Sequence, residues 1–214
     1  MVNYRSIGRR GAGKKRPMPH EMLFGLRDLP RGFGPTVKRW LERAEVLDPV
    51  YQLYLSTIYN PQSYLEQRFL NLVQALEVYH RRAISSSDLQ EEEHKKRKEE
   101  ILEAVPDQHR AWLEDKLEYS NEPNLARRLK EIIRKYQESA YSVVGVRSKD
   151  RDRFVYKVVT TRNYHTHFDK SKEAKAARGV ELYQITEQLK LLIEICLLGD
   201  LGFEAKRIRD LLNK

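Results

Sequence analysis

The chain has 214 residues, 40% hydrophobic and 33% charged, so it can bury a core beneath a heavily charged surface. No run approaches the roughly 20 consecutive apolar residues of a membrane helix, and no signal-peptide pattern follows the basic amino terminus. The single cysteine, Cys196, excludes a disulfide framework and a cysteine-based zinc site, and its apolar surroundings predict burial. We therefore expect a soluble cytoplasmic protein. The formal net charge of +9 favours a polyanionic partner such as nucleic acid.

Residues 1–35 differ in composition from the rest and are predicted to form a basic, flexible N-terminal arm. The first twenty contain six Lys or Arg residues and no acidic residue, and the segment is rich in Gly and Pro. Gly8–Lys15 matches the phosphate-loop pattern except at its last position, where Lys15 replaces the Ser or Thr that holds magnesium. We also expect the preceding strand of that motif to be missing, since only Met1–Ile7 stand before the pattern. The pattern favours a charged tail, which can add nonspecific affinity for phosphates.

Residues 36–214 are predicted to form one helical domain. Thr36 can cap a first helix, and Pro49 stands at the start of a second. The next helix begins near Pro61 and carries the broad apolar stripe of a central helix. Glu77 lies at the edge of that stripe, so its carboxylate is predicted to lie at the rim or to be buried with a partner.

A charged helical excursion is expected over residues 88–138. Residues 91–100 alternate in charge as a solvated helix does, and Pro106 and Pro123 each begin a further helix. Short turns make these helices antiparallel neighbours, and Gly145 ends the excursion. The sequence leaves open whether this segment is a lid, a dimer contact or a platform for substrate.

Two long helices follow. One runs from about Arg151 to His167, and after a charged linker the most apolar helix of the chain begins at Gly179. Gly199 and Gly202 are predicted to close it, before a short amphipathic C-terminal helix. No stretch shows sustained two-residue alternation, so we predict an all-α protein.

The stretch Arg162–His167 combines side chains suited to phosphate chemistry. Arg162 offers a fixed fork of donors for phosphate oxygens, and His167 can move a proton near neutral pH. Asn163 and His167 project together on a helix, and Arg162 joins them if the helix begins or bends nearby. No cluster of carboxylates lies beside the motif. A metal-free cut that uses the 2′-hydroxyl of RNA is therefore favoured.

The Arg-x4-His spacing is by itself weak evidence. From spacing alone, a solvated helix face is the favoured interpretation of Arg162 and His167. His165 and His167 also suggest a metal, but two histidines without Cys or clustered Asp and Glu ligands disfavour that interpretation.

Three segments resemble the ApeA-like HEPN family. Phe69–Arg81 (FLNLVQALEVYHR) resembles its first core helix, and Thr161–Phe168 (TRNYHTHF) resembles its catalytic helix. Cys196–Phe203 (CLLGDLGF) is more loosely similar to the end of its closing core helix. The resemblance covers about residues 45–214, with the three segments in the expected order.

The resemblance implies an antiparallel HEPN-like helical bundle that pairs with a second copy. The Arg-x4-His motifs of two protomers then face each other and form a ribonuclease site. Carried over to this sequence, Arg162 and His167 are the catalytic pair, Asn163 is the polar residue beside the arginine, and Glu77 is the supporting carboxylate of the early core helix. His165 stands where an apolar or small residue is expected.

Together these features predict a homodimeric endoribonuclease that needs no metal or cofactor and acts on RNA in antiviral defence or as a toxin. Two alternatives stay open: a non-catalytic HEPN module that binds RNA or a protein, and a helical interaction domain without a nucleic-acid role. ApeA-like proteins carry a large portion ahead of this domain. We therefore expect a fragment or a stand-alone relative, with a regulatory domain or partner absent from this chain.

Overall fold

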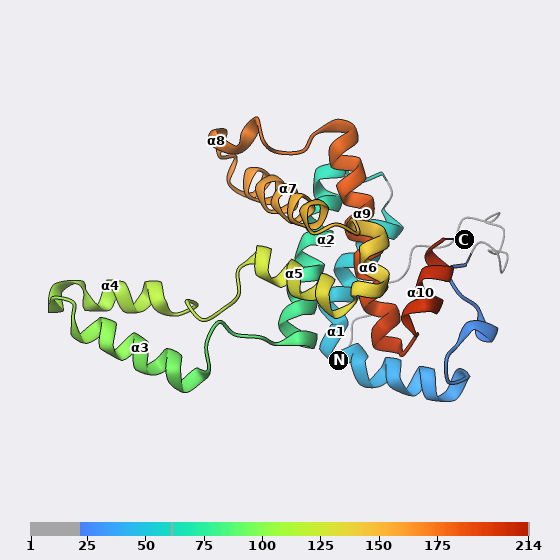
Figure 1. Ribbon diagram of the computed structural model, residues 1–214, viewed down its shortest axis with the longest axis horizontal. Helices are drawn as coiled ribbons and strands as arrows, with labels where there is room; N and C mark the ends of the chain where they lie inside the picture. Colours follow the sequence, from blue (N-terminus) through green and yellow to red (C-terminus); the bar gives the residue numbers. More distant parts are fainter. Residues whose placement is uncertain (1–21, 61, 214) are drawn as a thin grey trace.

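The computed structural model describes residues 22–60 and 62–213, and in this part of the chain every regular element is helical (Figure 1). The all-α prediction is therefore confirmed. The phosphate-loop-like segment Gly8–Lys15 lies outside the described residues. The elements are η2 Leu26–Asp28, α1 Phe33–Tyr59, α2 Leu65–Tyr79, its π-helical continuation η3 His80–Ile84, α3 Glu91–Glu103, α4 Asp107–Leu117, α5 Leu125–Lys135, α6 Gln137–Val144, α7 Ser148–His167, α8 Lys170–Glu173, α9 Gly179–Leu201 and α10 Ala205–Leu212.

Helix α2 lies at the centre of the bundle and packs against α1, α5, α7 and α9 (Figure 1). From Arg68 to Tyr79, Gln74 is the one exposed residue, so the apolar stripe predicted from the sequence covers most of the helix. The helix begins at Leu65, later than the predicted start at Pro61, which is not among the described residues. Its largest buried side chains are Phe69, Leu72, Leu76 and Tyr79.

Helix α1 is continuous, so the prediction of two helices separated at Pro49 was wrong. Proline removes one backbone donor and crowds the preceding turn, which weakens a helix interior by about 3 kcal/mol. Leu47 and Val50 flank Pro49 and are fully buried in the main core. Burial of these two side chains therefore offsets the local penalty, and packing against α2 and α9 holds the helix together.

The described end of the predicted N-terminal arm packs against the C-terminal part of the chain. The rings of Phe24 and Phe203 lie 5.3 Å apart, and Arg207 forms an ion pair with Asp28. Helix α1 begins at Phe33, ahead of the predicted cap, and the Thr36 hydroxyl instead donates a hydrogen bond of 2.8 Å to the Gly32 carbonyl. Residues 22–32 thus close one end of α1.

Helix α9 ends at Leu201, and only one of the two predicted closing glycines has that role. Gly202 caps the helix with a φ of 93°, a conformation that favours glycine. Gly199 lies inside the helix, where a Cβ atom would approach Cε1 of Tyr136 to 2.5 Å. The Tyr136 hydroxyl is also hydrogen-bonded to that of Tyr79 at 2.5 Å, so its ring is fixed from two sides.

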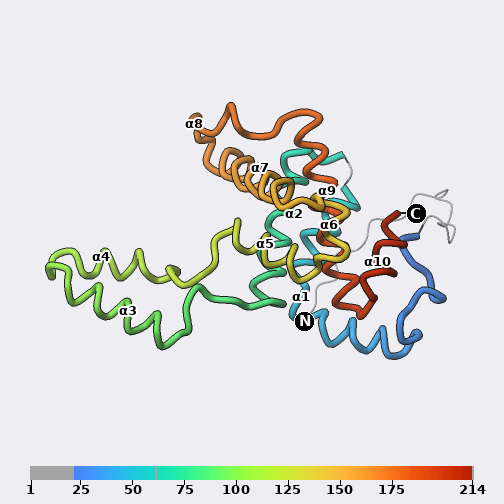
Figure 2. The backbone as a smooth tube through the Cα atoms, in the orientation of Figure 1, coloured from blue at the N-terminus to red at the C-terminus, as the bar shows by residue number. Residues whose placement is uncertain are grey.

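The predicted charged excursion divides into two parts. Helices α3 and α4 form a hairpin that projects away from the bundle, as the backbone trace in Figure 2 shows, and neither contains a buried residue. Helices α5 and α6 instead contribute to the core, with Leu129, Ile132 and Ala140 fully buried. Helix α3 therefore contains the solvated helix that was predicted over residues 91–100.

A buried polar cluster lies where the hairpin joins the bundle. His80 is fully buried and its Nε2 lies 2.7 Å from a Glu131 carboxylate oxygen. Glu131 also accepts hydrogen bonds from Ser86 at 2.5 Å and from Arg127 at 2.9 Å. Burial alone raises the pKa of Glu131, but the hydrogen bonds outweigh it and lower that pKa to about 2. Charged and hydrogen-bonded groups thus fix the chain on both sides of the hairpin.

We expect Gly199→Ala to lower the free energy of unfolding by roughly 1–2 kcal/mol. The added methyl group collides with the fixed Tyr136 ring, and this overpacking outweighs the higher helix propensity of alanine. Gly34→Ala is the matched control, because no atom lies within 4 Å of a Cβ placed there in α1. Urea unfolding followed by circular dichroism measures both variants, and a Gly199→Ala protein as stable as wild type would contradict the packing argument.

Candidate functional site

The last two turns of α7 carry the side chains that the sequence singles out. The helix is anchored by Phe154, Val155 and Val158, which are buried in the main core. Near its end, the hydroxyl of buried Thr161 accepts a hydrogen bond of 2.9 Å from the Ala177 backbone N–H. This bond links the segment before α9 to α7. The end of α7 is therefore held by this bond as well as by the core packing of the preceding turns.

Arg162 lies between α7 and α2. One of its Nη atoms lies 3.8 Å from a carboxylate oxygen of Glu77, and the other donates a hydrogen bond of 3.3 Å to the Asn163 side-chain oxygen. The Arg162 and Glu77 side chains are 32% and 28% exposed. A long, partly solvated ion pair of this kind contributes little stability, so the guanidinium can still bind an anion. The structure brings Arg162, Asn163 and Glu77 together.

His167 is not part of that group. It is exposed at the last residue of α7, and its side chain makes no hydrogen bond or ion pair with any residue the structure describes. Because α7 is unbroken through Arg162, the bend that would let the two side chains converge is absent. Residues five apart on a helix project about 140° apart. One copy of the chain therefore separates Arg162 from His167.

His165 points inward. Its ring lies 5.0 Å from that of Tyr164 and 6.4 Å from that of Phe69 on α2, measured between centroids. Its Nε2 is buried and has no hydrogen-bond partner among the described residues. Burial lowers the pKa of His165, since the protonated ring is poorly solvated there. His165 therefore packs between α7 and α2. An apolar or small side chain was expected at this position.

An aromatic and basic edge beside His167 was missed by the sequence analysis. Phe168 is 71% exposed, and its ring lies 6.1 Å from that of Tyr164. Arg178 lies 5.6 Å from the centroid of the Tyr164 ring and donates a hydrogen bond of 3.4 Å to its hydroxyl. Arg178 also forms an ion pair of 2.7 Å with Glu173. An exposed aromatic ring such as that of Phe168 suits the stacking of unpaired nucleic-acid bases. An aromatic residue directly after His167 was the available signal, but the place of Arg178 depends on the fold.

The described residues also bear on the membrane and metal predictions. Within 22–60 and 62–213, no helix combines the length and the apolar character that a bilayer span requires. The same residues contain no group of three or more His, Cys, Asp or Glu side chains placed to hold a metal ion. Cys196 is fully buried, as predicted, and burial raises the pKa of its thiol.

The family model described as Apea-like HEPN matches residues 70–207, from the first turns of α2 into α10. The chain belongs to the Apea-like HEPN family. No curated protein and no solved structure matches the chain. The HEPN match confirms the resemblance seen in the sequence, and it spans Glu77 on α2 as well as Arg162 and His167 on α7. The roles of these three side chains stay predictions.

We expect His165→Phe to raise the free energy of unfolding at pH 7 by about 1 kcal/mol, because it removes a buried nitrogen without a partner. The lowered pKa of His165 also makes the wild type less stable as pH falls below about 6.5, where the unfolded chain binds the proton more readily. The variant should therefore lose less stability on acidification. Urea unfolding at several pH values measures both effects.

His109→Phe is the matched control, because His109 is exposed on α4 and far from α2 in the sequence. Its stability should follow the wild type across the pH range. A His165→Phe protein that is less stable than wild type at every pH would show that the imidazole stabilises α7.

Proposed function

We propose that this HEPN protein is a metal-independent endoribonuclease whose site is completed when two copies pair. One observation carries the proposal: Arg162 and His167 both reach solvent at the end of α7, yet they diverge within one chain. The weakly paired guanidinium and the unpartnered imidazole are each available to a ligand. An enzyme of this kind would act on cellular RNA in antiviral defence or as a toxin.

The divergence of the two side chains is the reason for a second copy. Side chains about 140° apart on one helix point in different directions, so they are not preoriented toward one phosphate. A twofold axis beside α7 would bring the same surface of another copy to face it, since such interfaces use one patch on both subunits. His167 of one copy and Arg162 of its partner could then contact one phosphodiester.

The chemistry follows from the two side chains and from RNA itself. The 2′-hydroxyl of the substrate attacks the adjacent phosphorus, and the bond to the 5′-oxygen of the next nucleotide breaks. His167 takes the proton from the attacking hydroxyl, and the leaving oxygen takes a proton from water, to which His167 then returns its own. Arg162 stabilises the negative charge that grows on the non-bridging oxygens. The products are a 2′,3′-cyclic phosphate and a 5′-hydroxyl.

Asn163 and Glu77 are positioning residues in this proposal. Asn163 accepts a hydrogen bond from the Arg162 guanidinium, and Glu77 faces it from α2. Both restrict the guanidinium without fully neutralising it, so it need not reorganise when an anion binds. His165 supports the site by packing between α7 and α2.

The surroundings of His167 suit a single-stranded substrate. Phe168 and Tyr164 offer aromatic rings on which unpaired bases can stack, and Arg178 places a cation over the Tyr164 ring. The net charge of +9 further favours association with a polyanion. RNA is therefore the substrate class that fits this edge best.

Incubation of the full chain with single-stranded RNA in EDTA should give cleavage that leaves 2′,3′-cyclic phosphate ends. DNA of the same sequence should stay intact, because it lacks the nucleophile. His167→Ala and Arg162→Ala should each slow cleavage by about 10²-fold or more. His109→Ala on α4 and Arg153→Ala on α7 are the matched controls, since both residues are exposed.

Two results would contradict this mechanism: cleavage that requires magnesium, or cleavage that survives His167→Ala. RNA binding without any change in RNA length, in the wild type and in that variant alike, would favour a non-catalytic binding module.

Mixing the two inactive variants tests the shared site. A heterodimer of Arg162→Ala and His167→Ala copies keeps one site with an intact Arg162 from one copy and an intact His167 from the other. Subunit exchange should therefore restore about a quarter of the wild-type rate, because half of the dimers are mixed and each has one complete site. No recovery, despite exchange confirmed by native mass spectrometry, would show that the catalytic pair lies within a single copy.

A further inference from the structure

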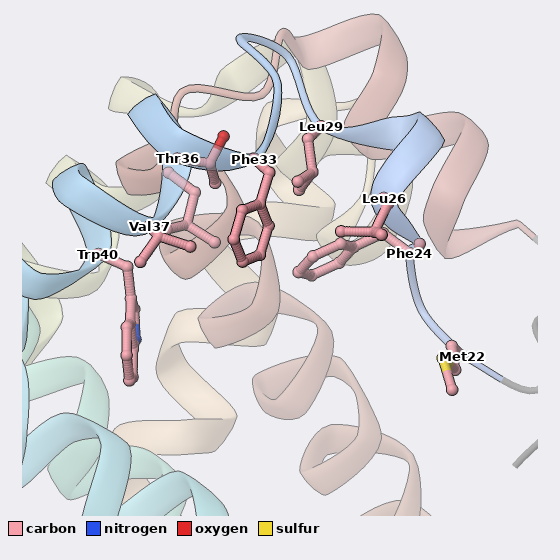
Figure 3. Close-up of a pocket in the computed structure, with 10 residues that line it drawn as sticks. Met22, Phe24, Leu26, Leu29, Phe33, Thr36, Val37 and Trp40 are labelled. Carbon is pink, nitrogen blue, oxygen red and sulfur yellow. The ribbon is translucent and has the colours of Figure 1, made fainter.

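An apolar groove of about 450 Å³ lies between η2 and the first two turns of α1 (Figure 3). Residues 22–29, which include η2, form one wall, and the first turns of α1 form the other. Helix α9 contributes the side chain of its last residue. Figure 3 shows Phe33 and Leu29 pointing to the same side of the ribbon, with Trp40 further along α1. The main lining residues are Leu26, Leu29, Phe33, Val37, Trp40 and Leu201.

The groove leaves large apolar side chains in contact with water. Leu26 is 71% exposed, Phe33 is 65% exposed and Trp40 is 45% exposed. Phe33, Val37 and Trp40 follow the i, i+4, i+7 spacing of one helix face, which normally packs against another element. A contiguous exposed apolar surface of this kind marks an interaction site.

Both walls of the groove are fixed before any ligand binds. The wall around η2 is held in place by Phe24, whose ring packs on that of Phe203, and by the ion pair between Asp28 and Arg207. The α1 wall is held by Arg39, which donates a hydrogen bond to the Asp200 carbonyl at the end of α9. A groove with preformed walls loses little conformational freedom on binding, which favours affinity.

Cationic residues stand next to the lining residues in the chain: Arg27 and Arg31 lie within two residues of Leu26 and Leu29, and Lys38 follows Val37. Arg27 and Arg31 are exposed on the turn side, and neither forms an ion pair with any residue in the described part of the chain. Lys38 is exposed on α1 and makes only a long, solvated contact of 3.9 Å with Glu42. Apolar walls bordered by unneutralised cations are complementary to a segment with one apolar face and acidic side chains beside it.

We propose that this groove binds an acidic amphipathic helix of a partner protein. A helix is the segment that presents apolar side chains along one edge of a rigid rod, which matches a groove formed beside α1. In Figure 1 the start of α1 and the end of α7 lie on different sides of the molecule, so the groove is separate from the proposed ribonuclease site. The proposal stands independently of that activity.

A pair of fluorescein-labelled helical peptides provides the probe. Both carry leucines along one face, and one has glutamates beside them where the other has lysines. Fluorescence anisotropy with the full chain should show the acidic peptide binding at least about tenfold more tightly than the basic one. Phe33→Ser and Leu26→Ser should each weaken that binding by about tenfold, because they remove apolar contacts from the walls.

Charge reversal tests the contribution of the cationic residues to binding separately from that of the apolar walls. The double variant Arg27→Glu/Arg31→Glu should reverse the preference, so that the basic peptide binds more tightly than the acidic one. Tyr183→Ser and Arg153→Glu are the matched controls, because both residues are exposed elsewhere, on α9 and α7. Circular dichroism checks that every variant is folded.

Three outcomes would overturn the proposal. Absent or equal binding of the two peptides would remove the charge argument. Dissociation of a dimer by Phe33→Ser, seen by light scattering, would assign the groove to a second copy of this chain. Tighter binding to anionic phospholipid vesicles than to the acidic peptide, lost in Phe33→Ser, would assign it to a membrane surface.

Discussion

Enclosure of α2 by α1, α5, α7 and α9 is the constraint on which the other parts of the structure depend. The surface of a helix is limited, so each neighbouring helix packs against a different stripe of side chains on α2, and that stripe fixes the position of the neighbour. Glu77 lies on α2 at the boundary between the buried face and the solvent-exposed face. Arg162 on α7 forms an ion pair with it. The geometry of the candidate site is thus a consequence of how the core is packed.

The same packing keeps Arg162 and His167 apart within one copy. Helix α7 needs a regular, unbroken backbone to bury its apolar side chains against α2 and α5. That regularity separates Arg162 and His167 around the helix axis. In the proposed enzyme a second molecule would bring these groups together, which would link catalysis to association.

The sequence predicted well those features that depend on local periodicity. The apolar stripes of α2 and α9 and the helix starts near Pro106 and Pro123 are read directly from the spacing of residues. Pro49 was misread because burial of its neighbours overrides a local helix breaker. Gly199 was misread because its role depends on Tyr136, which is distant in the sequence. For the site, the sequence left Glu77 either at the rim or buried with a partner, and the structure shows it partly exposed beside Arg162. Only the fold brings Arg178 to Tyr164.

The hairpin of α3 and α4 contributes no buried side chain, and polar contacts at its base, such as the ion pairs of Glu122 with Arg81 and Arg128, connect it to the bundle. Changes in the length or composition of its outer turns therefore leave the core and the end of α7 untouched. In evolutionary terms this separates a part that must stay constant from a part that can vary. Natural relatives are expected to differ most at the tip of this hairpin, and insertions there should be tolerated.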